Sequence, residues 1–254
     1  MLFLLSGSCA TRKDLSYLNN LPEIGGEGTF TMEIPDYRIQ YRDILYLTIK
    51  AMLPDGTITD FLSSMRGSGT ATYAQGEAGQ YLFGYDVNRE GQVIIPVLGP
   101  LTVAGLTLDE AREKVQEVSD MHFNSATVEC KLLSFKFTVI GEVKVPGTYI
   151  NYNNYLTVLE AIGRSGGISD FGRRDRILVV RPIPGGTRTY TLDLGDKAIL
   201  KSDAYFLLPN DVIIVEAESR KIFNLNLSTL SFILTTTTSL LTTTFLMVNY
   251  FNKP

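Results

Sequence analysis

The chain has 254 residues, which leaves room for one or two domains besides any terminal segments. Its net charge is −4, with 23 lysines and arginines against 27 aspartates and glutamates, and the absence of a basic run argues against a nucleic-acid partner. One histidine and two cysteines give poor support to a zinc site, so the composition predicts no metal, no cofactor and no catalytic centre.

The N-terminus has an apolar run, followed by small residues and then Cys9. This order resembles a bacterial lipoprotein signal, in which the cysteine becomes the lipidated first residue. The run is shorter than a signal peptide of about 15–30 residues and has no basic start, which would fit a start codon further upstream. We expect lipidation at Cys9, with residues 1–9 as a signal remnant and residues 10–33 as a tether. The alternative is an apolar terminus with an incidental cysteine.

Residues 34–135 are expected to form the first domain. The segment 37–49 alternates and is rich in β-branched and aromatic residues, which indicates a strand pair or one long bent strand. The segment 62–79 is rich in Gly, Ser and Ala and is predicted to be a mobile loop or insertion. Strands are expected at 92–97 and 101–103.

A helix is predicted to follow these strands. Thr107 is a good N-cap, and Glu110 three residues later completes a capping box. The buried face of this helix is predicted to consist of Leu108, Ala111, Val115 and Val118. In the alternating strand after the helix, Cys130 is interpreted as a core residue rather than a redox group.

Residues 136–218 are expected to form a second domain. It should begin with a strand at 137–142 and a type II turn in which Gly147 takes a positive φ. A short helix is predicted at 156–162, and its end is expected at the glycines that follow. Three further strands should complete the domain. Several strands with one helix packed across them predict an α+β or β-grasp-like unit.

Arg173, Arg174 and Arg176 form the one basic cluster of the chain, partly balanced by Asp170 and Asp175. One interpretation is a solvated loop with inter-subunit ion pairs. The other is contact with an anionic polymer that passes through a central channel.

The C-terminal segment 221–254 is predicted to be a membrane-spanning helix that begins between Ile222 and Ser228. Residues 222–252 contain no charge and would extend roughly 45 Å as a helix, longer than the hydrocarbon core of about 30 Å. Polar side chains on one face are predicted to line a pore: Asn224, Ser228, Ser231, Thr235, Ser239 and Thr242. Apolar side chains on another face are expected to meet lipid, among them Leu230, Leu234, Leu241 and Phe245.

Two stretches of the chain carry family resemblances. The first resembles the polysaccharide biosynthesis/export domain of Wza-type outer-membrane export proteins. It runs through Tyr37-x-Ile39, Asp43-Ile44-Leu45, the glycine- and proline-marked segment 87–99 and the segment 103–111. Tyr41-Arg42 stands where the family commonly has Pro-Gly. The second stretch, from Phe137 to about Glu216, resembles the SLBB domain, a β-grasp module that follows the export domain in this family.

The resemblance implies an α+β protein: an export domain, one SLBB β-grasp domain and a C-terminal membrane-spanning amphipathic helix. It implies a lipid-anchored outer-membrane channel with its body in the periplasm, which would export a capsular polysaccharide or exopolysaccharide and perform no catalysis. The implied partners are further copies in an octamer-like ring, a Wzc-type inner-membrane co-polymerase, the polysaccharide and outer-membrane lipid.

The C-terminal segment also fits other interpretations. It could be an inner-membrane anchor, because a solitary helix can bond its threonine hydroxyls back to its own backbone. A β-structure is a second option, because threonine favours strands, although in lipid it would need a closed barrel. The alternative function is a monomeric lipid-anchored periplasmic module that binds a glycan or a soluble ligand.

Overall fold

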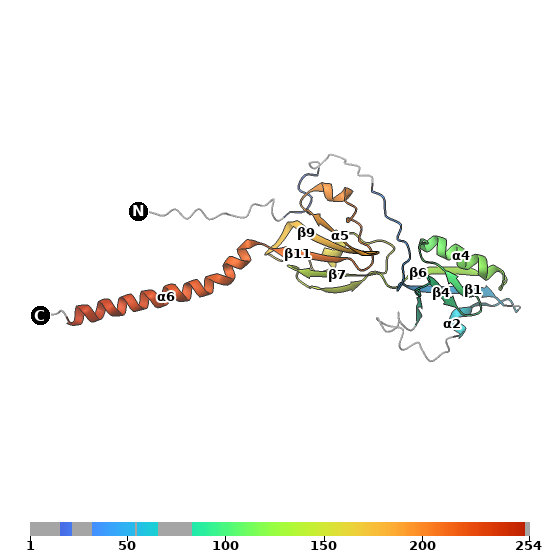
Figure 1. Ribbon diagram of the computed structural model, residues 1–254, viewed down its shortest axis with the longest axis horizontal. Helices are drawn as coiled ribbons and strands as arrows, with labels where there is room; N and C mark the ends of the chain where they lie inside the picture. The colour runs from blue at the N-terminus through green and yellow to red at the C-terminus, as the bar shows by residue number, and fades with distance from the viewer. Residues whose placement is uncertain (1–15, 22–31, 54, 66–82, 252–254) are drawn as a thin grey trace.

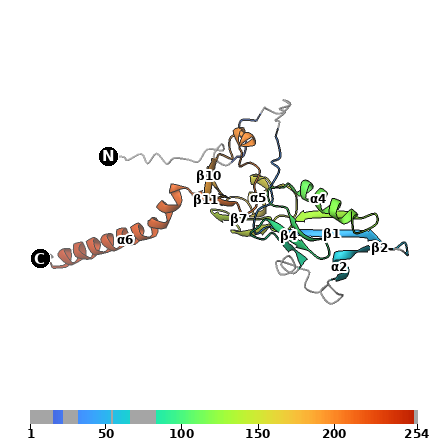
Figure 2. The same cartoon turned by 45° about the vertical axis from the view of Figure 1, so that its right-hand side comes forward.

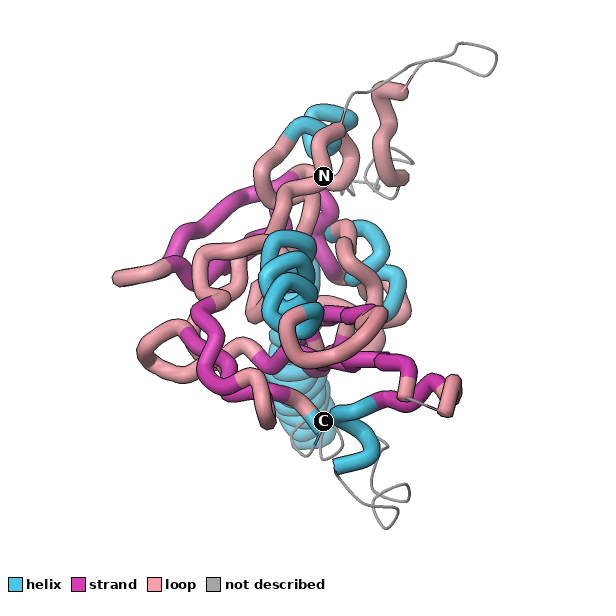
Figure 3. Tube along the Cα trace, turned by 90° about the vertical axis from the view of Figure 1, so that its right-hand side faces the viewer, coloured by secondary structure: helices cyan, strands magenta, loops and turns pink. Residues whose placement is uncertain are grey.

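The computed structural model describes residues 16–21, 32–53, 55–65 and 83–251. Two domains follow one another along the long axis of the molecule, and the helix α6 (Ser219–Phe251) leads away from the second domain on the side opposite the first (Figure 1). Viewed along the long axis, α6 is seen nearly end-on (Figure 3). The chain therefore forms an elongated rod with its long helix at one end.

The first domain is built on β1 (Ile44–Met52), which lies in the middle of an antiparallel sheet. One edge of β1 pairs with β6 (Thr127–Leu132), and the other pairs with β2 (Ile58–Asp60) and β3 (Tyr85–Asp86). A separate hairpin joins β4 (Gln92–Ile95) to β5 (Gly99–Thr102). Alternate residues of β1 are buried, so the sheet presents one face to the core.

The helix α4 (Leu108–Asp120) covers this sheet (Figure 2). The predicted capping box is confirmed, because the Thr107 side chain accepts from the backbone N–H of Glu110 at 3.2 Å and the Glu110 carboxylate accepts from the N–H of Thr107 at 2.8 Å. Ala111 and Val115 are buried as expected, but the third buried position is Ser119 rather than Val118. The Ser119 hydroxyl donates to the Val115 carbonyl at 2.7 Å, which makes its burial possible.

The strand expected over 37–49 begins only at Ile44, and this part of the prediction was wrong. The preceding residues fold around the buried carboxylate of Asp43. It accepts hydrogen bonds from the Tyr37 hydroxyl at 2.7 Å and from the Gln40 backbone N–H at 2.8 Å. Arg42 has a φ of 74°, so the turn keeps a left-handed conformation that glycine adopts more easily.

The segment expected to be a loop from residue 62 begins as a helix. α2 (Phe61–Met65) follows β2 directly, and the Asp60 carboxylate accepts from the backbone N–H groups of Leu62 and Ser63 at its start. Leu62 is buried in the core of the first domain. The rest of the predicted loop, residues 66–79, lies outside the described residues.

The second domain contains a five-stranded mixed sheet in the order β10-β9-β11-β7-β8. The central strand β11 (Val212–Ala217) runs parallel to β7 (Lys136–Gly141) and antiparallel to β9 (Gly172–Ile183). The edge strands are β8 (Gly147–Ile150) and β10 (Gly186–Leu192). A short 3₁₀ helix, η2, spans Lys197–Lys201. The sheet therefore consists of two hairpins, β7-β8 and β9-β10, with β11 inserted between them.

One helix, α5 (Val158–Arg164), packs on this sheet. It begins with a second capping box between Thr157 and Glu160 and buries Val158, Ala161 and Ile162. Gly163 lies inside the helix, which ends with Ser165 at the C-cap. The predicted type II turn with a positive φ at Gly147 was wrong, because β8 already begins at this glycine and its φ is not positive.

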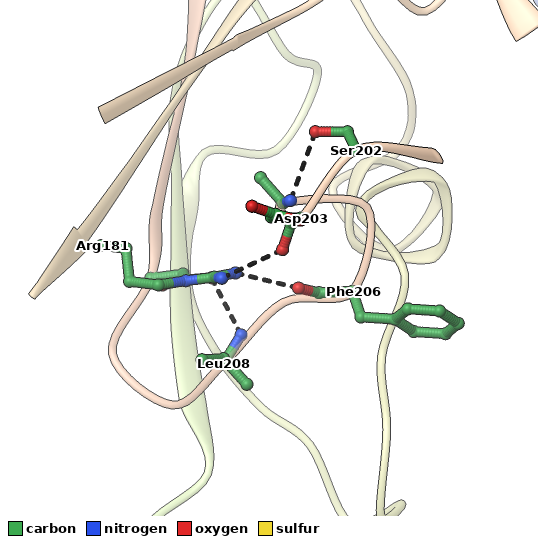
Figure 4. Close-up of polar contacts among 7 residues, drawn as sticks. Arg181, Ser202, Asp203, Phe206 and Leu208 are labelled. Carbon is green, nitrogen blue, oxygen red and sulfur yellow. Dashed lines mark hydrogen bonds and ion pairs between the residues drawn. The ribbon is translucent and has the colours of Figure 1, made fainter. Parts of the chain in front are cut away.

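A buried ion pair holds the loop before β11. Arg181 from β9 is 7% exposed and donates to the Asp211 carboxylate, which is 0% exposed, at 2.7 Å. Figure 4 shows the same guanidinium directed at the backbone carbonyls of Phe206 and Asp203, which lie at 2.8 and 3.1 Å. The Asp211 carboxylate also accepts from the Leu208 backbone N–H. The turn before β11 is thus fixed by one side chain of the neighbouring strand.

The two domains are joined by only three residues, Leu133–Phe135, and each is hydrogen-bonded to one of the domains. The Leu133 N–H donates to the Ile44 carbonyl at 2.8 Å. The Ser134 hydroxyl donates to the Asp43 carboxylate at 3.1 Å, and the Phe135 carbonyl accepts from the Asn151 N–H at 2.8 Å. All three residues of the connection are therefore restrained by hydrogen bonds.

Candidate functional site: the C-terminal helix and its base

The base of α6 is attached to the second domain by an ion pair. Lys221, in the first turn of α6, contacts the Glu142 carboxylate after β7, and the Ser169 hydroxyl donates to the same carboxylate at 2.7 Å. The pKa of Glu142 is lowered first by the bond from Lys221 and then by the bond from Ser169. Because the Glu218 N–H donates to the Phe171 carbonyl, the chain between β11 and α6 is held as well.

The helix begins at Ser219, earlier than the sequence indicated. The expectation that it would begin between Ile222 and Ser228 was wrong, because the charged residues before the apolar run belong to its first turn. With 33 residues it is about 50 Å long. By length and composition, its part from Ser231 to Phe251 is sufficient to cross a membrane, and none of this part is buried against the rest of the chain.

The polar positions predicted on this helix fall on one side of it. At about 100° per residue, Ser231, Thr235, Ser239 and Thr242 lie within an arc of about 80°, and all four are exposed. The side chains of Asn224 and Ser228 lie outside the described residues, although the helix backbone passes through both positions. The sequence reasoning missed Asn249, which the same angle places beside Ser231.

The apolar residues cover most of the remaining circumference. Leu234, Leu241 and Phe245 form the face that was expected to meet lipid, and each is more than half exposed. A second apolar row on the far side of the helix consists of Ile233, Leu240, Met247 and Phe251, and it is also exposed. The described part of the helix therefore offers a wide, mainly apolar surface with threonines among its residues, and one polar face that Leu246 interrupts.

The threonine hydroxyls of this part of the helix are bonded within the helix. Each of the seven threonines from Thr235 to Thr244 donates to a backbone carbonyl three or four residues earlier, at distances of 2.5 to 3.0 Å. A hydroxyl with this partner loses little when it leaves water. Threonines outside the polar face, such as Thr237 and Thr244, are thereby compatible with an apolar environment.

The three arginines singled out from the sequence lie on β9, not in a loop as one interpretation assumed. Arg173 forms two hydrogen bonds with the Asp175 carboxylate, at 3.0 and 2.6 Å, and Arg176 pairs with Glu216 at 3.4 Å. The Arg174 guanidinium lies over the ring of Tyr17, 5.8 Å from its centroid. Because two of the three charges are balanced locally, the cluster offers little net charge to an anionic polymer.

A short N-terminal segment, residues 16–21, docks beside these arginines. The backbone N–H groups of Leu18 and Asn19 donate to the carbonyls of Leu194 and Gly195 at 2.9 and 2.6 Å. The Asn20 side chain donates to the Asp196 carboxylate at 2.9 Å. Together with the first residue of α6 this segment borders a groove of about 610 Å³. The N-terminal segment and the base of α6 therefore lie at the same end of the second domain.

Only one of the two cysteines, Cys130, lies among the described residues. Cys9, the predicted lipidation site, lies outside the described residues. Cys130 is partly buried against the core of the first domain, in agreement with its interpretation as a core residue, and burial raises the pKa of its thiol to about 12. Among the described residues, no group of three or more His, Cys, Asp or Glu side chains could hold a metal ion.

Comparison with protein families divides the chain in the same way as its two cores. Residues 32–132 match the family described as polysaccharide biosynthesis/export protein, and residues 135–215 match the SLBB domain. The two matched parts follow one another in this order and are called the export domain and the SLBB domain. The export domain contains the sheet around β1 with α4, the SLBB domain contains the mixed sheet with α5, and α6 follows the SLBB match.

Two curated relatives agree with this assignment. The chain is 32% identical over 102 residues to the EPS I polysaccharide export outer membrane protein EpsA of Ralstonia solanacearum. It is 30% identical over 115 residues to the protein of the same name from Ralstonia nicotianae. The aligned parts cover 39% and 44% of this chain, and 27% and 29% of the relatives. The chain thus spans less than a third of the relatives that it matches.

Proposed function

We propose that this chain is a subunit of an outer-membrane channel that exports a capsular polysaccharide or exopolysaccharide. The support comes from two family matches in the order typical of Wza-type export proteins and from the names of the Ralstonia relatives, which are polysaccharide export outer membrane proteins. The body would lie in the periplasm, and α6 would cross the outer membrane. The SLBB domain would adopt a β-grasp fold, which its mixed sheet with one helix across it supports.

The observation that carries the proposal is the exposed helix α6. A single anchoring helix is usually apolar all around, whereas α6 combines a wide apolar surface with one polar face. If several copies form a closed ring, their polar faces can turn toward a water-filled centre while the apolar faces meet lipid. The ring would be octamer-like by the family resemblance, and its lumen would be lined by the hydroxyl and amide side chains predicted for this role.

The N-terminal segment supports attachment to the same membrane. Cys9 lies seven residues before Ser16, so a fully extended chain would place it at most about 25 Å from the docked segment. The docked segment lies at the base of α6. A lipid on Cys9 would therefore enter the membrane that α6 spans. The opposite end of the rod, formed by the export domain, would face a Wzc-type inner-membrane co-polymerase.

The assembly is tested with the full chain extracted in mild detergent. We expect a particle several times the mass of one 28.2 kDa chain, and stepwise ion conductance when it is inserted into planar bilayers. A monomer that produces no conductance would refute the channel. Two lysine variants form a matched pair for the pore. Thr242→Lys should lower the conductance, whereas Thr244→Lys, on another face of α6, should impair membrane insertion.

A second candidate function is favoured by the hydroxyl bonding in α6. Because the threonines between Thr235 and Thr244 are satisfied within their own helix, a solitary α6 could stay in lipid. The chain would then be a monomeric lipid-anchored module that binds a periplasmic glycan. The mass measurement separates the two functions, since only the channel requires several copies.

A further inference from the structure

The junction between the two domains forms a cleft of about 640 Å³ on the described part of the chain. One wall comes from the turn before β1, with Gln40, Tyr41 and Arg42. The other wall comes from the SLBB domain, with Lys136 at the start of β7 and Asn210 before β11. The volume falls within the range of about 300–1,000 Å³ that small-molecule sites usually have, and such sites often lie between domains.

The exposed charge on the walls of this cleft is positive. Arg42 and Lys136 are both exposed, and neither pairs with a carboxylate of the described residues. This contrasts with Arg173 and Arg176, which are balanced by Asp175 and Glu216. Unbalanced cations on a concave wall attract anionic ligands.

An aromatic ring, Tyr41, lies beside the Arg42 cation on the export-domain side of the cleft. The Arg42 guanidinium stands 5.2 Å from the centroid of the Tyr41 ring, and the Arg89 side chain donates to the Tyr41 hydroxyl at 3.4 Å. Tyr41 itself is 45% exposed. Bonds from Arg89 and Arg42 lower the pKa of this hydroxyl, and the charge of the Glu90 carboxylate acts in the opposite direction. The wall thus presents a partly exposed ring beside the Arg42 guanidinium, while Arg89 lies outside the cleft lining and holds the ring by its hydroxyl.

The Asp43 carboxylate also borders the cleft, but it is only 4% exposed. Its oxygens are occupied by Tyr37, the backbone of Gln40 and Ser134. It therefore supports the floor of the cleft and leaves the positive side chains to face a ligand.

Two residues with a left-handed backbone line opposite walls of this cleft. Arg42 has a φ of 74° and Asn210 a φ of 68°, and each is held by a backbone bond, to the Val87 carbonyl at 3.0 Å and to the Lys136 carbonyl at 2.7 Å. Glycine would adopt either conformation with less strain. Non-glycine residues in this conformation cluster at active sites and ligand clamps, and of these two the arginine is the less common occupant.

We propose that this cleft binds an anionic saccharide, meaning a few sugar units that carry carboxylate groups. Arg42 and Lys136 would contact the carboxylates, because charge-assisted hydrogen bonds to such groups are the strong ones. The apolar face of a sugar ring would lie on Tyr41, while the amides of Gln40 and Asn210 would exchange hydrogen bonds with its hydroxyls. This inference rests on the proposed function, since it names the class of polymer that the export protein would contact.

The shape of the cleft favours a saccharide over a protein partner. Protein interfaces commonly bury about 800 Å² on each side of a broad patch, whereas this site is a bounded concavity with amides, one exposed ring and two unpaired cations. A neighbouring copy of the chain that inserts an acidic segment would use the same cations. The experiment below distinguishes this outcome by the mass of the particle.

The test is calorimetric titration of the full chain in detergent. The probe is a hexamer of galacturonic acid, and the neutral control is a hexamer of glucose. We expect the acidic probe to bind about tenfold or more tightly than the neutral one. Arg42→Gly and Lys136→Ala should each weaken its binding by about tenfold, while Arg176→Ala, a matched arginine away from the cleft, should leave it unchanged.

Arg42→Gly guards against loss of folding as an explanation. Because glycine relieves the left-handed strain at this position, the variant should unfold at a higher temperature than the parent while it binds the acidic probe more weakly. No binding of the acidic probe, or equal binding by parent, Arg42→Gly and Lys136→Ala, would overturn the inference. A changed particle mass in these variants with unchanged saccharide binding would assign the cleft to subunit contact and overturn it too.

The inference and the proposed function can fail separately. Mass and conductance are measured on the same preparations as saccharide binding. A conducting ring that binds neither probe contradicts the cleft and leaves the channel. A monomer without conductance that still binds the acidic probe through Arg42 and Lys136 contradicts the channel and upholds the cleft.

Discussion

The guanidinium of Arg181 is almost fully enclosed, and among the described residues its charge is paired with that of Asp211. Removal of one partner of such a buried pair leaves the other charge without compensation. Arg181→Met should therefore lower the free energy of unfolding by about 3–5 kcal/mol. Arg176→Met removes an exposed pair with Glu216 and should cost less than about 1 kcal/mol. Urea unfolding of both variants gives the comparison, and equal losses would mean that the pair does not hold the loop.

The buried carboxyl of Asp43 gives the export domain a specific pH dependence. Burial raises the pKa of this group, although bonds from Gln40, Tyr37 and Ser134 act in the opposite direction. A raised pKa in the folded state means that the folded state binds the proton more tightly than the unfolded state. The contribution of Asp43 to stability should thus increase as the pH falls through its folded pKa, and level off below the unfolded value of about 3.9.

This sign can be measured as a difference between two proteins. The side chain at position 43 of the Asp43→Asn variant does not titrate. The unfolding free energy of the parent minus that of this variant should therefore be larger at pH 4.5 than at pH 7.5. Groups common to both proteins cancel in the difference. A relative stability of the parent that is lower at pH 4.5 than at pH 7.5 would contradict the raised pKa.

At this scale, contacts could be predicted from the sequence only where the two partners lie close together along the chain. The capping box of Thr107 and Glu110 needs only a three-residue spacing, so the pattern alone identified it. The equivalent box at Thr157 and Glu160 has the same spacing and could have been found in the same way. The role of Asp43 could not, because Ser134 lies 91 residues away in the sequence.

At the scale of elements, α6 makes a prediction about accessibility. Thr242 and Leu241 are neighbours in sequence but lie on the polar and the apolar face of the helix. In membranes, Thr242→Cys should react with a membrane-impermeant maleimide from the aqueous lumen, whereas Leu241→Cys should not. The parent chain measures the background, and the raised pKa of Cys130 makes its thiol slow to react. The reverse pattern would exclude the pore-lining assignment.

The parallel pair of β7 and β11 depends on a close approach at Gly141. This glycine has a φ of 91°, and a Cβ there would lie 2.1 Å from the Val215 carbonyl oxygen. Gly141→Ala should therefore destabilise the SLBB domain by about 3 kcal/mol or more. Gly185→Ala has a similar φ of 82° with open space around it and should cost about 1 kcal/mol. Thermal unfolding that shows equal effects would refute the steric explanation.

The elements themselves were predicted well where a periodic pattern was sufficient. The strands β4 and β7, and the helix α4, lie close to the positions expected from alternation and helical periodicity. The expected strand before Ile44 and the positive φ at Gly147 were wrong, because alternation does not reveal a carboxylate that organises a turn or a glycine that already lies in a strand. The polar face of α6 follows from spacing alone, whereas the bonding of its threonines required coordinates.

At the scale of the whole molecule, two anchors would act on one membrane. Cys9→Ser should abolish incorporation of labelled fatty acid but leave the chain in the membrane fraction, because α6 remains. A chain that ends at Glu218 and carries Cys9→Ser should be found in the soluble fraction. Fractionation with each single change as a control measures the two contributions. Release of the Cys9→Ser chain from membranes would show that α6 does not hold it.

The three-residue connection at Leu133–Phe135 has a mechanical consequence. Hydrogen bonds on both sides of it restrain these three residues, so a torque applied to one domain is transmitted directly to the other. The Glu142–Lys221 ion pair couples the second domain to α6 in the same way. A force applied to the export domain near the end of β1 would thus tilt α6 at the other end of the molecule. The stiffness of the two connections would determine how far the helix moves.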